Sequence, residues 1–270
     1  MYACDFEYDG LKLSDFGFIV CEFDGSNGTE IANAGSEITF ITTPIHSGKR
    51  YVRSGTKYDK CLSTTFQICK NPDTHNEDEL ALTDDEFRAL SRWLNRREYL
   101  WFHSFDGEVT TRPYFRASFN LKRIEIGKVT YGVELDMVTD APFGYGEEET
   151  VSLSFSAGAL TKTFDDLSDE IGEIYPETTI QCGSSGDLVL TNDITGCSFE
   201  VDDCVSGETI SLSGDTMIIT SSLQTHDIAN SFNYDFFRFG NTYDQTTNTV
   251  TASIPCTVTM KYRPIIKDTL

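Results

Sequence analysis

The chain has 270 residues, enough for one large domain or two ordinary ones. Its hydrophobic content of 39% and aromatic content of 12% are those of a globular protein and exclude a disordered one. The net charge of −22 at pH 7 repels phosphate backbones and argues against nucleic-acid binding. No run approaches the ~18 apolar residues that a membrane-spanning helix needs. The first residues carry no secretory signal, so we expect folding in a cytoplasm or exit by a signal-independent route.

In the first half we expect one helix among strands. Thr83 and Glu86 form a capping box for a helix over 84–97, whose apolar stripe contains Phe87, Leu90 and Leu94. Arg96 and Arg97 are placed at its C-terminal end. Period-2 patterns predict strands over 2–8, 16–23, 37–43, 61–70, 99–105, 113–124 and 128–139.

Turn signals separate these strands. Asp9-Gly10 predicts a turn between the first two strands, Pro44 is expected to end the third, and Gly127 predicts a long hairpin between the last two. After Pro44 comes a polar, Gly-containing segment, whose only acid is Asp59. This segment concentrates bases in an acidic chain: Lys49, Arg50, Arg53, Lys57 and Lys60.

The second half is expected to be a β-sandwich. Turn residues and acids over 140–149 mark a domain boundary. Beyond it the pattern predicts short strands near 151–155, 178–182, 187–191, 197–201, 208–212, 215–220, 235–239 and 249–262. The Gly-Ser-Ser-Gly run at 183–186 is predicted to be a hairpin loop.

No catalytic, cofactor or metal residues are predicted. The eight cysteines contain no Cys-x-x-Cys pair and are expected to be buried free thiols, with disulfides or a metal site as alternatives. No Gly-x-Ser-x-Gly elbow and no phosphate-binding glycine pattern is present. His226-Asp227 is interpreted as an exposed loop pair, and Trp93 and Trp101 are expected in the core rather than on a sugar-binding face.

Several motifs, in their order along the chain, resemble the distal tail protein (Dit) of long-tailed phages. In the first half they are Phe6-Glu7-Tyr8-Asp9-Gly10, Asp15-Phe16-Gly17-Phe18-Ile19-Val20, the helix ending in Trp93-Leu94 with the aromatic strand after it, and the junction Asp140-Ala141-Pro142-Phe143-Gly144. In the second half they are Tyr175-Pro176, Leu190-Thr191-Asn192, Gly207-Glu208-Thr209-Ile210, Phe237-Arg238-Phe239-Gly240-Asn241 and Val258-Thr259-Met260-Lys261-Tyr262-Arg263-Pro264. The resemblance covers nearly the whole chain.

This resemblance implies a mainly β protein: an N-terminal ring-forming β domain with one α-helix over 1–145, then a galectin-like β-sandwich over 146–270. It implies a structural, non-enzymatic protein of the virion tail tip, assembled in the host cytoplasm without cofactors. Its expected partners are further copies in a hexameric ring, the tail tube protein, the tail-tip hub or tail-associated lysin, and receptor-binding or baseplate proteins. Specific nucleic-acid binding and membrane binding are not expected, and the acidic surface would let DNA pass.

The basic residues Lys49, Arg50, Arg53, Lys57 and Lys60 are then predicted to contact an acidic surface of a neighbouring subunit. A solvated loop is the alternative interpretation of the same segment. Two other functions stay open: a carbohydrate-binding adhesin acting through the second sandwich, and a hydrolase using a pair among the 43 acids.

Overall fold

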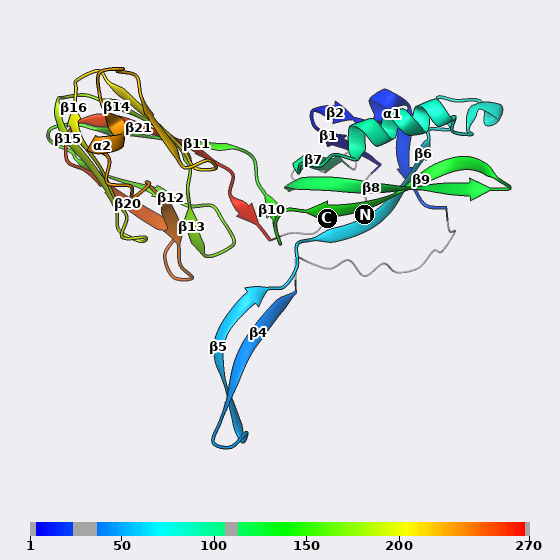
Figure 1. Ribbon diagram of the computed structural model, residues 1–270, viewed down its shortest axis with the longest axis horizontal. Coiled ribbons are helices and arrows are strands. Elements are labelled where there is room, and N and C mark those ends of the chain that lie inside the picture. The colour runs from blue at the N-terminus through cyan, green and yellow to red at the C-terminus, as the bar shows by residue number, and fades with distance from the viewer. Residues whose placement is uncertain (1–3, 24–36, 106–112, 268–270) are drawn as a thin grey trace. The chain divides into compact units, whose positions relative to one another are not determined.

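The computed structural model describes residues 4–23, 37–105 and 113–267 (Figure 1). By its contacts the chain divides into two compact units, Met1–Gly146 with Ile266–Leu270 and Glu147–Ile265. Each unit has its own hydrophobic core. The fold is mainly β, as predicted, with one substantial helix among the described residues. No helix in these described ranges has the length and apolar character needed to cross a membrane.

An antiparallel sheet forms the body of the first unit. Its main path runs β2-β1-β7-β8-β9-β6-β3, while β10 pairs with β8 and with β22. The strands are β1 (Asp5–Tyr8), β2 (Leu11–Lys12), β3 (Phe18–Cys21), β6 (Ser63–Lys70), β7 (Leu100–Phe105), β8 (Tyr114–Ile126), β9 (Val129–Thr139), β10 (Gly144–Tyr145) and β22 (Ile265–Ile266). Two further strands, β4 (Ile38–Ile45) and β5 (Arg50–Tyr58), form a separate hairpin.

The N-terminal strands are arranged differently from the prediction. The turn at Asp9-Gly10 joins β1 to the short β2, and β1 pairs with β7 on its other side. Phe16 ends the 3-10 turn Leu13–Phe16 instead of lying in a strand, and Gly17 follows with a φ of 77°. The chain then crosses to the opposite edge, where β3 pairs with β6. The two predicted strands are therefore real but lie at different places in the sheet.

Helix α1 (Asp84–Leu94) begins at the predicted capping box, in which Thr83 Oγ1 accepts from the Glu86 N–H and the Glu86 carboxylate accepts from the Thr83 N–H. Glu86 also pairs with the buried Lys70 of β6 at 2.8 Å, which fixes the start of the helix to the sheet. The helix ends earlier than predicted. Arg96 lies beyond it and pairs with Asp9 at 3.4 Å, because the loop after the C-cap turns back toward the β1–β2 turn.

Aromatic side chains fill the space between α1 and the sheet. Trp93 is 5% exposed, stacks on Phe16 at 4.5 Å, and donates from Nε1 to the Tyr8 carbonyl at 2.9 Å. The expected core position of Trp101 is wrong, since this residue is 40% exposed on β7. The predicted hairpin at Gly127 is confirmed, with the turn residues Gly127 and Lys128 at φ 60° and 71°.

The second unit is a sandwich of two antiparallel sheets, as expected, whose inward side chains share one core. The five-stranded sheet, in the order β11-β21-β14-β17-β18, contains β11 (Glu149–Phe155), β14 (Glu177–Cys182), β17 (Thr209–Ser213), β18 (Ile218–Ser221) and β21 (Cys256–Tyr262). The four-stranded sheet, in the order β12-β20-β15-β16, contains β12 (Thr161–Asp165), β15 (Gly186–Asn192), β16 (Ser198–Cys204) and β20 (Thr247–Ala252). A small pair, β13 (Gly172–Ile174) with β19 (Phe239–Asn241), and the short helix α2 (Ile228–Ser231) complete it.

Three details of this unit differ from the prediction. The run 249–262 is two strands, β20 and β21, in different sheets. The loop 183–186 is no hairpin, because it leads from β14 in one sheet to β15 in the other. Strands β12 and β13 have no counterpart in the predicted set. A linear pattern indicates strands but does not tell which sheet each strand joins.

Candidate assembly surface

The hairpin of β4 and β5, called the arm below, contains most of the predicted contact segment. Its two strands pair with each other and, within the described residues, with no other strand. Pro44 does not end β4, which continues to Ile45. Proline has no backbone N–H, but an edge strand tolerates it, and among the described residues each strand of the arm pairs on one side only. The polar, Gly-containing segment after Pro44 is therefore mostly the strand β5.

The basic residues of β5 lie on both faces of the arm, and a bulge decides the face of Lys57. Ile41 lies opposite Gly55 and Thr42 opposite Arg53, so Ser54 is an extra residue in β5. Since opposite residues share a face and faces alternate along each strand, Arg53 lies on one face and Arg50 and Lys57 on the other.

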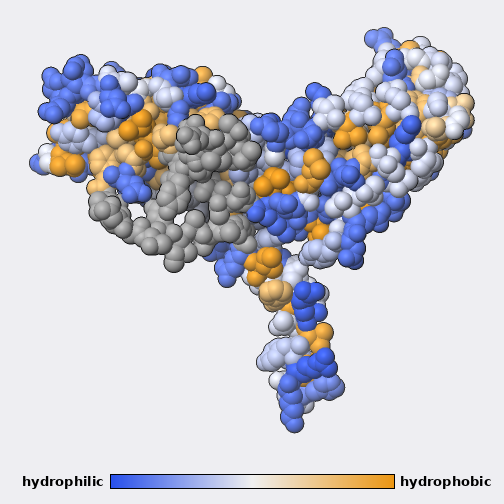
Figure 2. All heavy atoms as spheres, turned by 180° about the vertical axis from the view of Figure 1, so that it is seen from behind, coloured by the Kyte–Doolittle hydropathy of each residue, from blue (hydrophilic) through white to orange (hydrophobic). Residues whose placement is uncertain are grey.

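Both faces of the arm also carry exposed apolar side chains. The face of Arg53 presents Phe40 and Tyr51, which are 59% and 66% exposed, and the other face presents Ile41 and Val52. Figure 2 shows apolar and polar side chains next to one another along the arm. An isolated two-stranded hairpin is at best marginally stable in water. Burial of these exposed apolar side chains against a partner would therefore stabilise the arm.

The structure places all five predicted bases on the exposed surface of the arm or next to it. Arg50, Arg53 and Lys57 lie in β5, Lys49 in the turn before it and Lys60 just after it. Lys57 pairs with Asp59 at 2.7 Å, and this contact lowers the pKa of the Asp59 carboxyl. Sequence reasoning found the bases but missed the apolar residues beside them, although the alternation over 38–45 was a signal.

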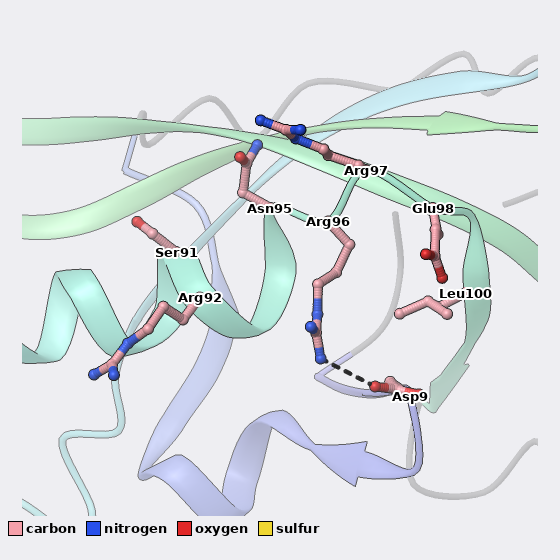
Figure 3. A pocket seen from close by; sticks show the side chains of 8 residues that line it. All are labelled: Asp9, Ser91, Arg92, Asn95, Arg96, Arg97, Glu98 and Leu100. Atoms are coloured by element: carbon pink, nitrogen blue, oxygen red, sulfur yellow. Dashed lines mark hydrogen bonds and ion pairs between the residues drawn. The ribbon is translucent and has the colours of Figure 1, made fainter.

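A second cluster of cations lies at the end of α1, around a pocket of about 740 Å³ (Figure 3). Arg92, Arg96 and Arg97 line it together with Asp9 and Glu98. Figure 3 shows that the three arginine side chains point in different directions and that Arg96 reaches Asp9. Because the guanidinium groups diverge, they do not form a single anion site.

The interpretation of His226-Asp227 as an exposed loop pair holds for Asp227 but is wrong for His226. His226 has a side chain only 7% exposed, and its Nδ1 lies 2.6 Å from the fully buried Glu208 carboxylate. The Ser221 hydroxyl donates to the same carboxylate oxygen at 2.5 Å, and the Val205 N–H donates to the other at 2.9 Å. Burial raises the pKa of Glu208, but these hydrogen bonds outweigh it and hold the pKa below its usual range. The serine donates to the carboxylate rather than to the imidazole, so the group is not arranged as a nucleophilic triad.

Glu208→Gln is expected to lower the stability of the second unit by about 1–3 kcal/mol at neutral pH, because an amide cannot accept all of these hydrogen bonds. Since the folded-state pKa of Glu208 lies below the unfolded value, its stabilisation is present above the unfolded pKa and is lost as pH falls through the folded pKa. Urea titrations of the unmodified protein and of Glu208→Gln, repeated from neutral to acidic pH, should show the difference between their free energies of unfolding shrinking as the pH falls. A difference independent of pH would contradict the assignment.

Two motifs of the second half, through Asn192 and Gly240, meet in a buried hydrogen-bond network around Asn248. Its Oδ1 accepts from Asn192 Nδ2 at 2.9 Å and from the Gly240 N–H at 3.2 Å. Its Nδ2 donates to the carbonyl oxygens of Gly240 at 2.9 Å and Thr246 at 3.1 Å. These motifs hold the fold together.

The cysteines are buried less completely than expected. Four are buried in the second unit, namely Cys182, Cys197, Cys204 and Cys256, while Cys4 and Cys61 are exposed and Cys21 and Cys69 half-buried. In the ranges 4–23, 37–105 and 113–267, no group of three or more acid, histidine or cysteine side chains is arranged to hold a metal ion.

Comparisons with known proteins agree with this architecture. Residues 1–141 match the family model described as a phage tail protein N-terminal domain, and residues 143–262 match a phage tail C-terminal domain. Among solved structures, the Dit protein of SPP1 matches with a TM-score of 0.64 and 16% identity, over 96% of this chain and 98% of that one. Its description is a paradigm of the hub adsorption apparatus in phages infecting Gram-positive bacteria. The expected Dit fold is thus confirmed. None of the curated proteins compared with the chain matches it.

Proposed function

The chain belongs to the family of phage tail proteins with these N- and C-terminal domains, and on this premise we propose that it forms a hexameric ring at the distal end of the tail. The observation that carries the proposal is its fold, shared along nearly its whole length with a protein described as an adsorption hub. In this proposal the ring links the tail tube to the tail-tip hub or lysin and to receptor-binding or baseplate proteins. Assembly takes place in the host cytoplasm.

The two halves have different parts in this proposal. Residues 1–145 form the ring, and residues 146–270 form a galectin-like sandwich that serves as scaffold. The acidic balance of the chain, −22 at pH 7, supports a channel along which DNA slides, because like charges keep phosphate from adhering.

The arm supplies the subunit contact in this proposal. Its exposed Phe40 and Tyr51 would be removed from water on a neighbouring copy, which stabilises a hairpin that is marginal alone. Lys49, Arg50, Arg53, Lys57 and Lys60 would meet the acidic surface of that copy, so charge would select the orientation of the contact. The two faces would act together, since each carries both apolar and basic side chains.

A mass measurement in solution tests the ring. We expect a species of six 30.2 kDa chains for the unmodified protein. The double variant Arg50→Glu/Arg53→Glu should weaken assembly at least about tenfold, because both faces then repel an acidic neighbour. Arg88→Glu on α1, whose side chain is 77% exposed and 3.9 Å from Asp85, is the matched control and should assemble normally. The ring proposal fails if the protein stays monomeric both alone and with the tail tube protein. If the double variant forms the ring normally, the proposed subunit contact is rejected, while the ring proposal stands.

A carbohydrate-binding adhesin is the second candidate, because the second unit exposes Tyr234 and Tyr243 at 69% and 86%. Exposed aromatic rings are surfaces on which sugars stack. Glycan-array binding by the full chain that disappears in Tyr234→Ala/Tyr243→Ala would favour the adhesin. Absence of glycan binding would favour the scaffold.

A further inference from the structure

Three cysteines lie together at one end of the sandwich in the second unit. Cys182 is the last residue of β14, Cys204 the last of β16 and Cys256 the first of β21. Each is at most 3% exposed. The proposed ring makes no use of them.

Backbone hydrogen bonds bring Cys182 and Cys204 next to each other although they belong to different sheets. The Gly207 N–H donates to the Cys182 carbonyl at 2.7 Å, and the Cys182 N–H donates to the Glu208 carbonyl at 2.8 Å. Gly186, which follows Cys182 around the corner between the sheets, is the ladder partner of Cys204. The corner over 183–186 and the turn over 205–208 therefore enclose the two thiols.

The two thiols lie close enough together to interact. Their contact lowers the pKa of Cys182 against the opposing effects of burial and of the Glu208 carboxylate, and the Cys204 thiol itself donates to the Val201 carbonyl at 3.4 Å. The same contact, together with burial, raises the pKa of Cys204. A thiolate is the nucleophile in thiol–disulfide exchange, and either of these two neighbouring thiols can start the exchange; the sequence below is written for attack by Cys182.

We propose that Cys182 and Cys204 form a disulfide on exposure to a small oxidised disulfide such as glutathione disulfide, and that this bond joins the two sheets. The Cys182 thiolate attacks one glutathione sulfur, forming a mixed disulfide and releasing one glutathione. Cys204 loses its proton to solvent, and its thiolate attacks the Cys182 sulfur and releases the second glutathione. Two protein thiols are oxidised and one glutathione disulfide is reduced to two thiols.

The setting of a tail protein fits this chemistry. A phage particle leaves the reducing interior of its host at lysis, and disulfides persist on virion surfaces. A bond between residues 182 and 204 closes a loop that the unfolded chain would otherwise leave open, so it stabilises the folded second unit. Because the thiols are buried, we expect slow oxidation of the native protein and faster oxidation during refolding.

Cys256 is the competing partner. It lies directly opposite Cys182 in the β14–β21 ladder, and burial raises the pKa of its thiol to about 12. A Cys182–Cys256 bond would join two strands that are already paired in one sheet. The contact of Cys182 with Cys204 favours the bond between the sheets.

The test is to refold the full-length protein in a glutathione redox buffer, to incubate a native sample in the same buffer, and to alkylate the remaining thiols. We expect peptide mapping by mass spectrometry to recover a linked Cys182–Cys204 peptide from the refolded protein. The melting midpoint of the second unit should rise by roughly 5–10 °C on oxidation. This rise should be absent in Cys204→Ala and present in Cys197→Ala, which removes another buried thiol of the same unit.

A linked Cys182–Cys256 peptide, or full alkylation of Cys182 and Cys204 after refolding in the oxidising buffer, would overturn the proposal. Peptide mapping of the unmodified chain decides the matter even if Cys204→Ala does not fold. Because the readout is a bond within one chain, this result is independent of whether the ring forms.

Discussion

Trp93→Ala is expected to lower the free energy of unfolding of the first unit by about 3–5 kcal/mol. Trp93 is 5% exposed between α1 and the sheet, where it stacks on Phe16 at 4.5 Å and on Phe6 at 5.8 Å. Its removal leaves a cavity that rigid aromatic neighbours cannot fill, and it also leaves the Tyr8 carbonyl without its indole donor. Urea denaturation followed by circular dichroism measures the loss.

The other tryptophan provides the matched control. Trp101 is 40% exposed and packs edge to face on Tyr145 at 5.5 Å. Trp101→Ala should therefore cost less than about 1.5 kcal/mol, because its ring is only partly removed from water and the space it leaves is open to solvent. Equal losses in the two variants would show that the aromatic cluster under α1 does not hold the first unit together.

Asn248→Ala is expected to destabilise the second unit by a similar amount, about 3–5 kcal/mol. The side chain is fully buried, and its amide satisfies both backbone groups of Gly240 as well as the Asn192 side chain. Each buried donor left without a partner costs about 1–3 kcal/mol. The loss should appear in the transition of the second unit in a thermal or urea scan.

Asn230→Ala is the control for this network. Asn230 lies exposed in α2, and its amide donates to the Asp227 carboxylate at 2.6 Å. Its replacement should change stability by less than about 1 kcal/mol. If Asn248→Ala were equally mild, water would have to enter the network and replace the lost amide.

Local patterns predicted the elements of the fold well where neighbours in sequence decide them. The capping box of Thr83 and Glu86 starts α1, and Gly127 supplies the turn between β8 and β9, as expected. Both rest on interactions within a few residues. The end of α1 was predicted too late, because tertiary contacts such as that of Arg96 with Asp9 draw the following chain away from the helix.

The candidate site could be predicted only in part. The five bases of the arm were visible as a charge cluster in an acidic chain. Alternation along the strand separates Arg50 from Arg53, but the face of Lys57 could not be predicted, because it depends on the bulge at Ser54, which appears only when β4 and β5 are paired. The exposure of Phe40 and Tyr51 was equally hidden, since an apolar strand residue is normally expected against a core.

The sequence by itself determined the class of protein: its mainly β character, the one substantial helix among the described residues and, through ordered motifs, its Dit fold. Such features depend on residue spacing and local turns, which are written along the chain. Only the tertiary structure decided which strands pair, that the loop 183–186 changes sheets, and that His226 meets Glu208 and Cys182 meets Cys204. These pairings join residues that are distant in sequence. The packing of strands and sheets around a common core selects them, and a local sequence pattern carries no information about that packing.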